Sequence, residues 1–224
     1  MSNQNRKNLS APTLRRVVRI VLTGGAAAGK SHVLEILASE ITPEKTFLGF
    51  PVAMVPECAT QLLSRGITPD RIGQTAFQHA VFRHQLQNEN RAFRAMLPAS
   101  KQIGLPVILL CDRGLCDGGA YIDPKTFTTI CHSFDYSRKR LLGRYQAVLY
   151  LDSAATLPDL DFDVQVGNAH RLESTRAEVL ATADNAYAAW QDHPHLTHIP
   201  AEPDFQVKVA NVRQTLCTIL DDYR

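Results

Sequence analysis

Glycines, a lysine and a serine at fixed spacing form the clearest candidate site of the chain, in the segment LTGGAAAGKS at residues 22–31. They fit the phosphate-binding pattern GxxxxGK[ST], in which glycines let backbone N–H groups turn towards phosphate oxygens. The lysine of this pattern reaches the outer phosphates and the hydroxyl binds Mg²⁺. We therefore expect a site for ATP or GTP with Mg²⁺, formed by Gly24, Gly25, Ala26, Ala27, Ala28, Gly29, Lys30, Ser31 and His32.

An acidic and a basic residue stand together at the end of another apolar run. Asp112 ends the run PVILLC (106–111), and Arg113 follows it directly. A carboxylate at this place can hold Mg²⁺ opposite Ser31 or accept a hydroxyl proton, and a guanidinium can bind an anion or offset charge during transfer. We expect Ser31 and Asp112 to be the Mg²⁺ ligands. The alternative is an aspartate that caps a turn beside a surface arginine.

Two further acidic residues each have two interpretations. Glu57, in VPECAT, follows the short apolar run at 52–56. It could be the base for an acceptor hydroxyl, or it could complement the dipole of a helix. Asp117, in CDGGAY, lies in a glycine-rich segment that indicates a turn first and a substrate contact second.

A predicted helix over residues 71–98 carries polar side chains that could line an acceptor pocket. This segment has no glycine or proline between Gly73 and Pro98. Gln78 and Gln85 are seven residues apart and so share one helix face. We take Gln78 and Arg83, with Asp117, as candidates for substrate contact; a solvated or inter-helix polar face is the alternative.

Two arginines follow the segment LPDLDFDVQVGNAH at residues 157–170. A mobile segment followed by Arg171 and Arg176 suits a lid that closes over a triphosphate. The alternative is an exposed loop followed by arginines on a helix surface. The full set of catalytic candidates is Lys30, Glu57, Asp112, Arg113, Arg171 and Arg176.

Short apolar runs must position these residues. Five of them are predicted strands, at residues 17–23, 52–56, 106–111, 146–152 and 196–201. Four helices are predicted between and after them. Apolar residues recur at helical spacing in residues 30–41, 71–98 and 205–220, and residues 171–191 are rich in Ala, Glu and Arg. Strands that alternate with helices predict an α/β fold, with a parallel sheet covered by helices on both faces. Ligands bind such sheets outside the carboxyl ends of the strands.

Bulk properties limit the classes of partner. Residues 17–224 fit one domain, and the polar residues 1–16 indicate a flexible N-terminal tail without the apolar run of a signal peptide. A formal net charge of +2 gives no reason to expect nucleic acid as a partner. The apolar runs are too short for a membrane span. Five scattered cysteines without a CxxC pair indicate a reduced, cytoplasmic protein.

Several segments resemble a known family when taken in order. They are VLTGGAAAGKS, VPECATQLL, FQ at 77–78, CDRGLCDGGAY, AVLYLDSAA, GNAHRLE and WQDHPHL. Together they resemble the NadR/TRPL-translocation-defect type of P-loop domain, which is grouped with AAA-like domains, over roughly residues 16–222. The resemblance implies a three-layer P-loop NTPase fold of kinase type. It also implies a five-stranded parallel sheet in the order 2-3-1-4-5.

The resemblance also implies functions. Members on the NadR side are ribosyl-nicotinamide kinases, whereas insect eye members work in protein trafficking and bind GTP and acidic phospholipid. Contact with acidic lipid is therefore implied for this chain by the resemblance alone. The acid–arginine pair after the strand at 106–111 is similar to that of thymidylate and deoxynucleoside kinases.

Two functions follow from these observations. The first is a Mg²⁺-dependent kinase that transfers the γ-phosphoryl group of ATP or GTP to a small nucleoside- or nucleotide-like acceptor, with Glu57 as the leading base. The second is a nucleotide-binding switch or slow NTPase that acts through protein or lipid partners. The chain has no [NT]KxD motif, which argues against a Ras-like GTPase.

Overall fold

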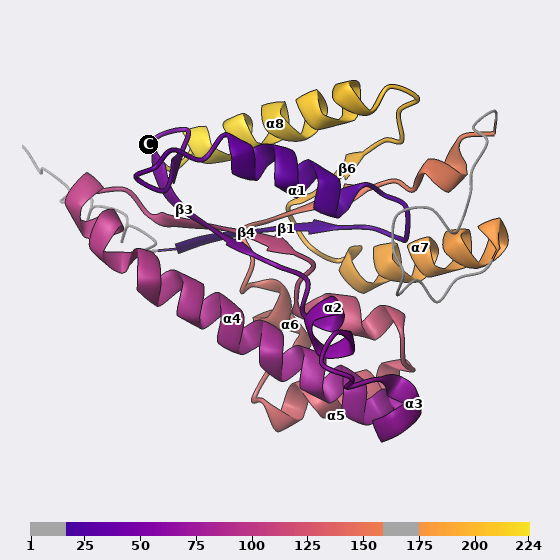
Figure 1. Ribbon diagram of the computed structural model, residues 1–224. Helices are drawn as coiled ribbons and strands as arrows, with labels where there is room; N and C mark the ends of the chain where they lie inside the picture. The colour runs from indigo at the N-terminus through magenta and orange to yellow at the C-terminus, as the bar shows by residue number, and fades with distance from the viewer. Residues whose placement is uncertain (1–16, 159–174) are drawn as a thin grey trace, which may run out of the picture.

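The structure of the protein is a computed structural model, which describes residues 17–158 and 175–224 (Figure 1). The strands are β1 (Val17–Thr23), β2 (Thr46–Phe47), β3 (Phe50–Val55), β4 (Val107–Asp112), β5 (Ala147–Leu151) and β6 (Leu196–Ile199). The α-helices are α1 (Lys30–Ser39), α2 (Cys58–Leu63), α3 (Pro69–Ile72), α4 (Gln74–Ile103), α5 (Pro124–Ser133), α6 (Arg138–Leu142), α7 (Arg176–Trp190) and α8 (Phe205–Asp221). Two 3₁₀-helices, η1 (Leu115–Ala120) and η2 (Ala154–Thr156), follow β4 and β5.

The described strands form one sheet in the order β2-β3-β4-β1-β5-β6. The expected number of five strands is wrong, because the two-residue strand β2 pairs antiparallel with the start of β3. A strand of two residues is too short to show the alternation of apolar and polar residues by which strands are predicted from sequence. The other five strands pair in parallel. Numbered among themselves along the chain, they stand in the order 2-3-1-4-5.

The sheet separates two apolar layers, because alternate residues of each strand point to opposite faces. Ile20, Leu110 and Leu149 pack with α1 and α8 on one face. Val21 and Leu109 pack with α4, α5, α6 and α7 on the other. Figure 1 shows α1 and α8 above the sheet and α4 below it. The predicted three-layer α/β arrangement is therefore confirmed.

Two helix boundaries differ from the predictions. Helix α4 continues through Pro98 to Ile103. Proline removes one backbone hydrogen bond, but the carbonyl that loses it belongs to the exposed residue Arg94 and can bind water instead. Helix α7 begins at Arg176 rather than at residue 171, with Thr175 as its capping residue. Residues 171–174 lie outside the described part of the chain.

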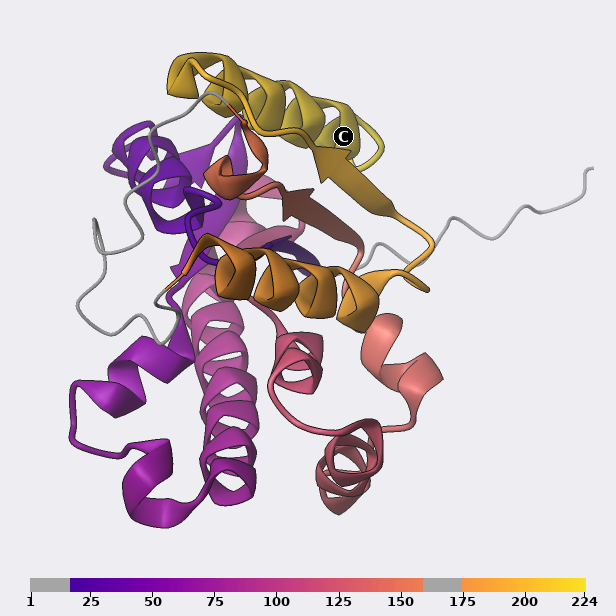
Figure 2. The ribbon, with the colours of Figure 1, turned by 90° about the vertical axis from the view of Figure 1, so that its right-hand side faces the viewer.

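The loops that could carry chemistry gather at one edge of this sheet. Figure 2 faces the side of the molecule that carries the loop between β1 and α1, with α7 crossing in front. Helix α7 packs against η1, which follows β4. Within the described residues, no helix is both long and apolar enough to cross a membrane.

Candidate active site

The loop between β1 and α1 has a backbone that needs glycine at two positions. Gly24 has a φ of 139°, and a Cβ atom there would lie 2.2 Å from the carbonyl oxygen of Leu151. Gly29 has a φ of 77°, and a Cβ atom there would lie 2.6 Å from the ring of Phe205. Side chains rarely adopt such φ values, so both glycines are required by conformation and by space.

Lys30 opens α1 and turns back into this loop. Its ammonium group donates hydrogen bonds to the carbonyl oxygens of Gly24 (3.0 Å) and Gly25 (2.8 Å). Burial, and then the nearby Arg113 guanidinium, lower the pKa of Lys30 to about 8. Carbonyl oxygens carry only partial charges, so the buried ammonium lacks a full counter-charge among these bonding partners.

The segment after β5 braces the loop from the side. The Ser153 hydroxyl donates a hydrogen bond to the carbonyl oxygen of Ala26 (2.7 Å). The backbone N–H of Ala154 donates to the carbonyl oxygen of Ala27 (3.1 Å). Sequence reasoning did not identify Ser153, although its place just after a predicted strand end could have marked it.

Asp112 ends β4 and meets Ser31 from α1. The Ser31 hydroxyl donates to one carboxylate oxygen of Asp112 (3.0 Å). The other oxygen, Oδ1, is buried and has no hydrogen-bond partner in the described structure. Burial raises the pKa of Asp112, although the nearby Lys30 ammonium opposes that shift. A hydroxyl beside a carboxylate oxygen that lacks a partner fits Mg²⁺, which prefers oxygen ligands.

Arg113 has a strained backbone that neighbouring elements hold in place. Its φ is 65°, in the left-handed region that is rare for residues other than glycine. The N–H of Arg113 donates to the carbonyl oxygen of Leu22 (3.0 Å), and its own carbonyl accepts from the Gln85 amide (3.1 Å). Strain of this kind gathers at functional sites when the surroundings enforce it.

The Arg113 side chain is held between two acids. It donates to Glu57 (Nε to Oε1, 2.7 Å) and to Asp117 (Nη1 to Oδ1, 3.2 Å). It also donates to the carbonyl oxygen of Gly24 (3.2 Å). The guanidinium therefore links Glu57 and Asp117 to the phosphate loop.

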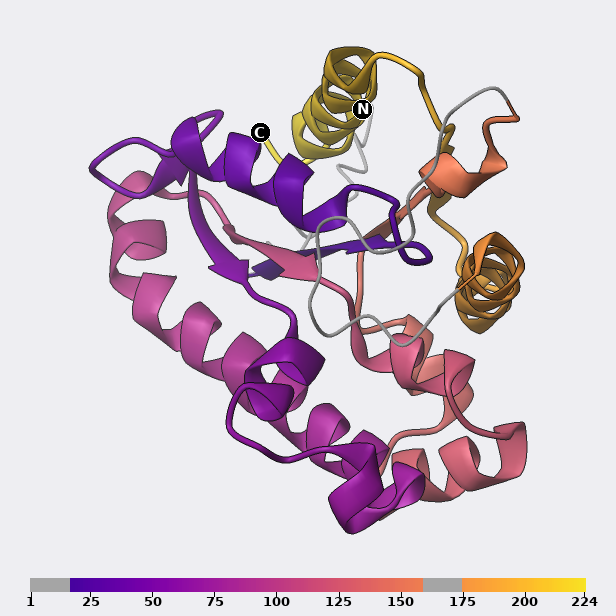
Figure 3. The same cartoon turned by 45° about the vertical axis from the view of Figure 1, so that its right-hand side comes forward.

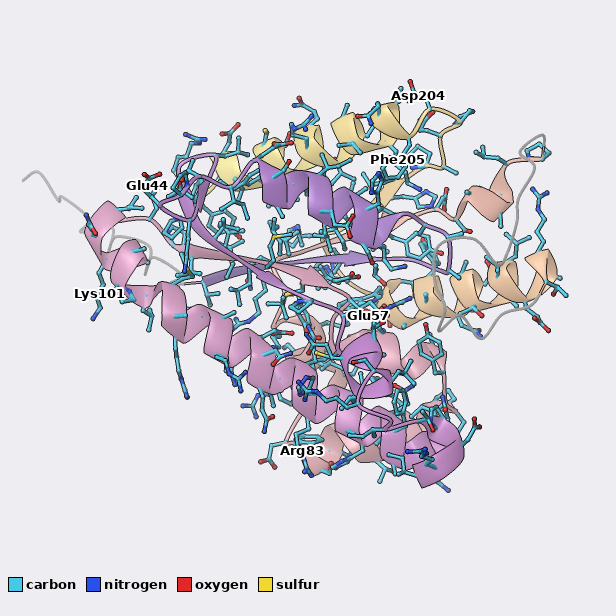
Figure 4. The ribbon with its side chains drawn as sticks, in the orientation of Figure 1. Glu44, Glu57, Arg83, Lys101, Asp204 and Phe205 are labelled. Carbon is cyan, nitrogen blue, oxygen red and sulfur yellow. The ribbon has the colours of Figure 1, made fainter. Side chains whose placement is uncertain are left out.

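Glu57 lies between β3 and α2, where it is the N-cap residue of α2. Figure 3 shows β3 leading into α2, which lies beside α4, and Figure 4 labels Glu57 at this junction. Its carboxylate accepts from Arg113 and from the Thr60 hydroxyl (2.7 Å). Burial alone would raise the pKa of Glu57, but Arg113 and Thr60 outweigh it and hold the pKa below its usual value. Glu57 is therefore ionised at neutral pH.

Asp117 is a structural hub of the β4–α5 connection. Besides Arg113, it accepts hydrogen bonds from the Thr23 hydroxyl (2.5 Å), the Gly114 N–H (2.8 Å) and the Trp190 indole N–H (3.0 Å). Both carboxylate oxygens are thus occupied by the protein itself. This arrangement favours the turn interpretation of Asp117 over direct contact with a substrate.

One cavity of about 370 Å³ joins the phosphate loop to these residues. Its far wall comes from Phe77, Gln78 and Gln85 of α4. It is completed by Tyr121, which precedes α5, and by Phe127 of α5. The two glutamines are buried. The prediction that they share one face is confirmed. Phe127 was not identified from the sequence, because nothing in its local context marks it.

A buried network holds this wall from behind. Glu89 of α4 is fully buried and accepts from the Gln85 amide (3.1 Å) and the Tyr145 hydroxyl (2.8 Å). It also pairs with Arg144 (2.7 Å). The Tyr145 hydroxyl in turn accepts from the backbone N–H of Leu115 (2.8 Å). The network fixes the start of η1 and, through Gln85, the strained backbone of Arg113.

Three predicted site residues lie away from the cavity or outside the described residues, and His32 lies only at the cavity rim. Arg83 is exposed and does not line the cavity (Figure 4). Arg176 donates to the backbone carbonyls of Ala155 and Leu157, so its guanidinium holds the η2 segment rather than facing the cavity. His32 is exposed at the cavity rim, with its ring 4.9 Å from that of Phe205. Arg171 lies outside the described residues.

Comparison with known proteins agrees with this geometry. The model of a family described as AAA domain matches residues 19–207 of the chain. The chain belongs to this AAA domain family. The fold is also similar to the crystal structure of thymidylate kinase from Ehrlichia chaffeensis, with a TM-score of 0.57 and 13% sequence identity. That alignment covers 89% of this chain and 98% of the kinase. No match is found among curated proteins.

For this AAA-domain protein, the likeness to the kinase shows the fold and not the substrate. The family and the fold together support a nucleotide-binding P-loop protein of kinase type. Such folds imply a nucleoside triphosphate as ligand. The narrower resemblance to NadR-type kinases stays a prediction.

Proposed function

We propose that the protein is a Mg²⁺-dependent kinase that transfers the γ-phosphoryl group of ATP or GTP to a hydroxyl of a small nucleoside-like acceptor. One observation carries the proposal: the phosphate loop and the Glu57–Arg113 pair line the same cavity, which continues into a wall of aromatic and amide side chains. A nucleotide-binding switch has no need of a shaped space for a second small molecule beside the phosphates.

In the proposed reaction, each charged residue has one task. The Lys30 ammonium binds the β- and γ-phosphates in place of the loop carbonyls. The acceptor oxygen forms a bond to the γ-phosphorus while the bond to the β,γ-bridging oxygen breaks, and the nucleoside diphosphate leaves with that electron pair. The acceptor proton passes to the Glu57 carboxylate and then to water. Arg113 orients Glu57 and offsets charge on the transferred group.

Ser31 and Asp112 are the residues that would hold Mg²⁺. The free Oδ1 of Asp112 and the Ser31 hydroxyl supply oxygen ligands at the phosphate end. When bound, the cation neutralises charge on the phosphate oxygens. Arg171 remains a candidate to bind the triphosphate from the segment that precedes α7.

Charges on the cavity wall favour a nucleoside over a nucleotide as the acceptor. Among the described residues that line the cavity, the lysine and arginine side chains are Lys30 and Arg113. Lys30 is taken by the triphosphate, and Arg113 is already paired with two carboxylates. A second phosphate group would therefore meet no unpaired guanidinium or ammonium among the described residues of the cavity wall. A planar base would instead meet aromatic rings and the amides of Gln78 and Gln85.

Product formation with Mg²⁺ tests the proposal. We would measure ADP and GDP release with and without pools of nucleosides, nucleotides and ribosyl cofactor precursors, with the Lys30→Ala protein as the blank. Strong stimulation by an unphosphorylated pool supports the proposal. Stimulation by nucleotides alone would support kinase activity but contradict the proposal that the acceptor is a nucleoside. Slow turnover indifferent to every pool would favour the switch or slow NTPase acting through protein or lipid partners.

A further inference from the structure

A second hollow, of about 570 Å³, lies on the other side of α2 from the cavity. Its floor is apolar and includes Met54 of β3 and Met96 of α4. Its rim carries three cations, Lys45, Arg65 and Arg91. We call this hollow the β3 groove. Figure 1 shows β3 with α1 above it and α4 below. Residues 52–55 of β3 line the groove, which therefore follows this strand.

The cations of the β3 groove have no ion-pair partner among the described residues. Lys45, Arg65 and Arg91 are exposed, and their side chains make no hydrogen bond or ion pair with any residue that the structure describes. The described residues that line the groove include no aspartate or glutamate. Burial, and then Arg65 and Arg91, lower the pKa of the neighbouring His84, as two nearby positive charges must. Like charges gathered without an acid favour the binding of an anion.

An added peptide strand fits the groove poorly. Edge strands can pair with another chain through their free backbone groups. The N–H of Val52 is already bonded to the carbonyl of Lys45 (2.9 Å), and Pro56 has no N–H to donate. The open edge is therefore residues 53–55, shorter than the roughly five or six residues of an ordinary strand. A compact anion fits better than an extended chain.

We propose that the β3 groove is a second ligand site, which takes an organic phosphate of metabolite size. The phosphate would sit on Arg65 and Arg91, and the apolar part of the ligand would lie over Met54 and Met96. Each guanidinium group can donate two parallel hydrogen bonds to phosphate oxygens. Two such groups therefore suit a doubly charged phosphate better than a singly charged carboxylate. The volume of the groove lies within the range of small-molecule sites.

Helix α2 connects this site to the cavity. Gln61 of α2 lines the groove together with Arg65, which lies just beyond the C-cap Ser64. Cys58 and Thr60 of the same helix line the cavity. Gln61 Oε1 contacts the His84 ring (2.8 Å) and accepts from the Asn88 amide (3.1 Å), which also contacts the Cys58 sulfur (3.4 Å). Glu57 directly precedes this helix. A ligand that draws Arg65 towards itself would therefore shift the helix that places the base, and this coupling rests on the proposed function.

Binding can be tested without any turnover. We would titrate phenyl phosphate, which joins a phosphate dianion to a flat apolar ring, into the Lys30→Ala protein by calorimetry, so that the phosphate loop is disabled. We expect saturable binding with one site per chain. The Arg65→Gln/Arg91→Gln double change in this background should weaken it roughly tenfold or more, because two charge-assisted bonds are lost. Arg94→Gln, an exposed arginine on the same helix that lines neither hollow, should leave it unchanged.

Three results would overturn this site. Binding of phenyl phosphate could fail to saturate, or it could be equal in the double variant and the parent. It could also be absent while vesicles containing phosphatidylserine bind through Arg65 and Arg91 and neutral vesicles do not, which would make the groove a lipid-binding surface. None of these results depends on whether the protein is a kinase.

The coupling needs a separate measurement on the otherwise unmodified chain. Saturating phenyl phosphate should change kcat for the proposed transfer by about fivefold or more, and the double variant should lose this response. Binding without any change in kcat would keep the site and overturn its action on Glu57. If no acceptor supports transfer at all, the proposed function fails while the calorimetric result stands.

Discussion

The two ends of the cavity differ in whether their charged side chains are paired within the protein. At the phosphate end, the Lys30 ammonium donates to the carbonyls of its own loop, and Asp112 keeps one buried oxygen without a partner. At the acceptor end, Arg113 is bonded to Glu57 and Asp117 at once. The phosphate end is thus completed by a charged ligand, whereas the acceptor end is already neutralised by the protein.

This difference indicates where binding energy and where positioning originate. A buried charge without a full counter-charge is unfavourable until a ligand supplies one, so the phosphate end should gain most from binding. The acceptor end holds its groups in place before any ligand arrives, as an active site that orients a hydroxyl requires. Substitutions at the two ends should therefore separate nucleotide affinity from turnover.

The largest effect is expected at the phosphate end. Lys30→Ala should weaken binding of ATP or GTP with Mg²⁺ about a hundredfold or more, because two charge-assisted contacts to phosphate disappear. Calorimetric titration with each nucleotide measures this directly. Unchanged affinity would show that the loop does not bind phosphate through Lys30.

Asp112→Asn should affect Mg²⁺-dependent turnover without affecting nucleotide affinity in the absence of Mg²⁺. Turnover should fall about a hundredfold or more because the Mg²⁺ ligand is lost, while nucleotide affinity without Mg²⁺ should stay near that of the parent. Titration of Mg²⁺ against turnover gives the measurement. Normal turnover at low Mg²⁺ would remove Asp112 from the metal site.

Glu57→Gln tests the acceptor end. Transfer should slow about a hundredfold, the usual range for loss of a general base, and nucleotide affinity should change little. Thr60→Val serves as a control, because it removes only the 2.7 Å hydrogen bond to the carboxylate and should cost much less. Equal losses of affinity and rate in Glu57→Gln would instead indicate a role in holding Arg113.

The pH dependence of binding should follow Lys30. In the ligand-free protein its pKa is about 8, and a bound triphosphate raises it. Below pH 8 the ammonium is already charged and affinity is full; above pH 8 binding must take up a proton, so affinity should fall by up to about tenfold per pH unit. Calorimetry between pH 7 and about 9.5 measures the slope. A Lys30→Arg protein stays charged and should lose this slope.

Gln78→Leu should have the smallest effect. We expect the KM of the acceptor to rise from a few-fold to about tenfold, since one neutral hydrogen bond to the acceptor is lost, with little change in nucleotide affinity. Gln87→Leu is the matched control, because Gln87 is an exposed glutamine of the same helix that does not line the cavity. A similar rise in KM in both variants would exclude a specific contact from Gln78.

Sequence reasoning succeeded where a feature is continuous along the chain. The strand, glycines, lysine and hydroxyl of the phosphate loop form one segment whose geometry follows from local rules. The strand-end rule also placed Glu57 and Asp112 at one edge of the sheet. Periodicity failed to predict β2, because a strand of two residues is too short to show a period. The predicted end of the long helix at Pro98 was also wrong, because α4 accommodates this proline at an exposed position.

The roles of charged side chains were harder to read, because a sequence does not show which partner satisfies each group. The sequence left Asp117 open between a turn and a substrate contact; hydrogen bonds from Thr23, Gly114, Arg113 and Trp190 favour the turn. Arg176 looked like part of a lid, yet it binds backbone carbonyls near η2. Those partners come from segments far apart in the chain.

The sequence by itself determined that the protein binds phosphate and folds as a parallel α/β sheet, because both follow from short-range spacing and periodicity. The tertiary structure alone decided which residues form the wall of the cavity and how their charges are paired. Glu57, Gln85 and Phe127 reach one cavity from three distant segments. Contacts between such distant segments depend on how whole helices pack against the sheet, which a local sequence pattern does not predict.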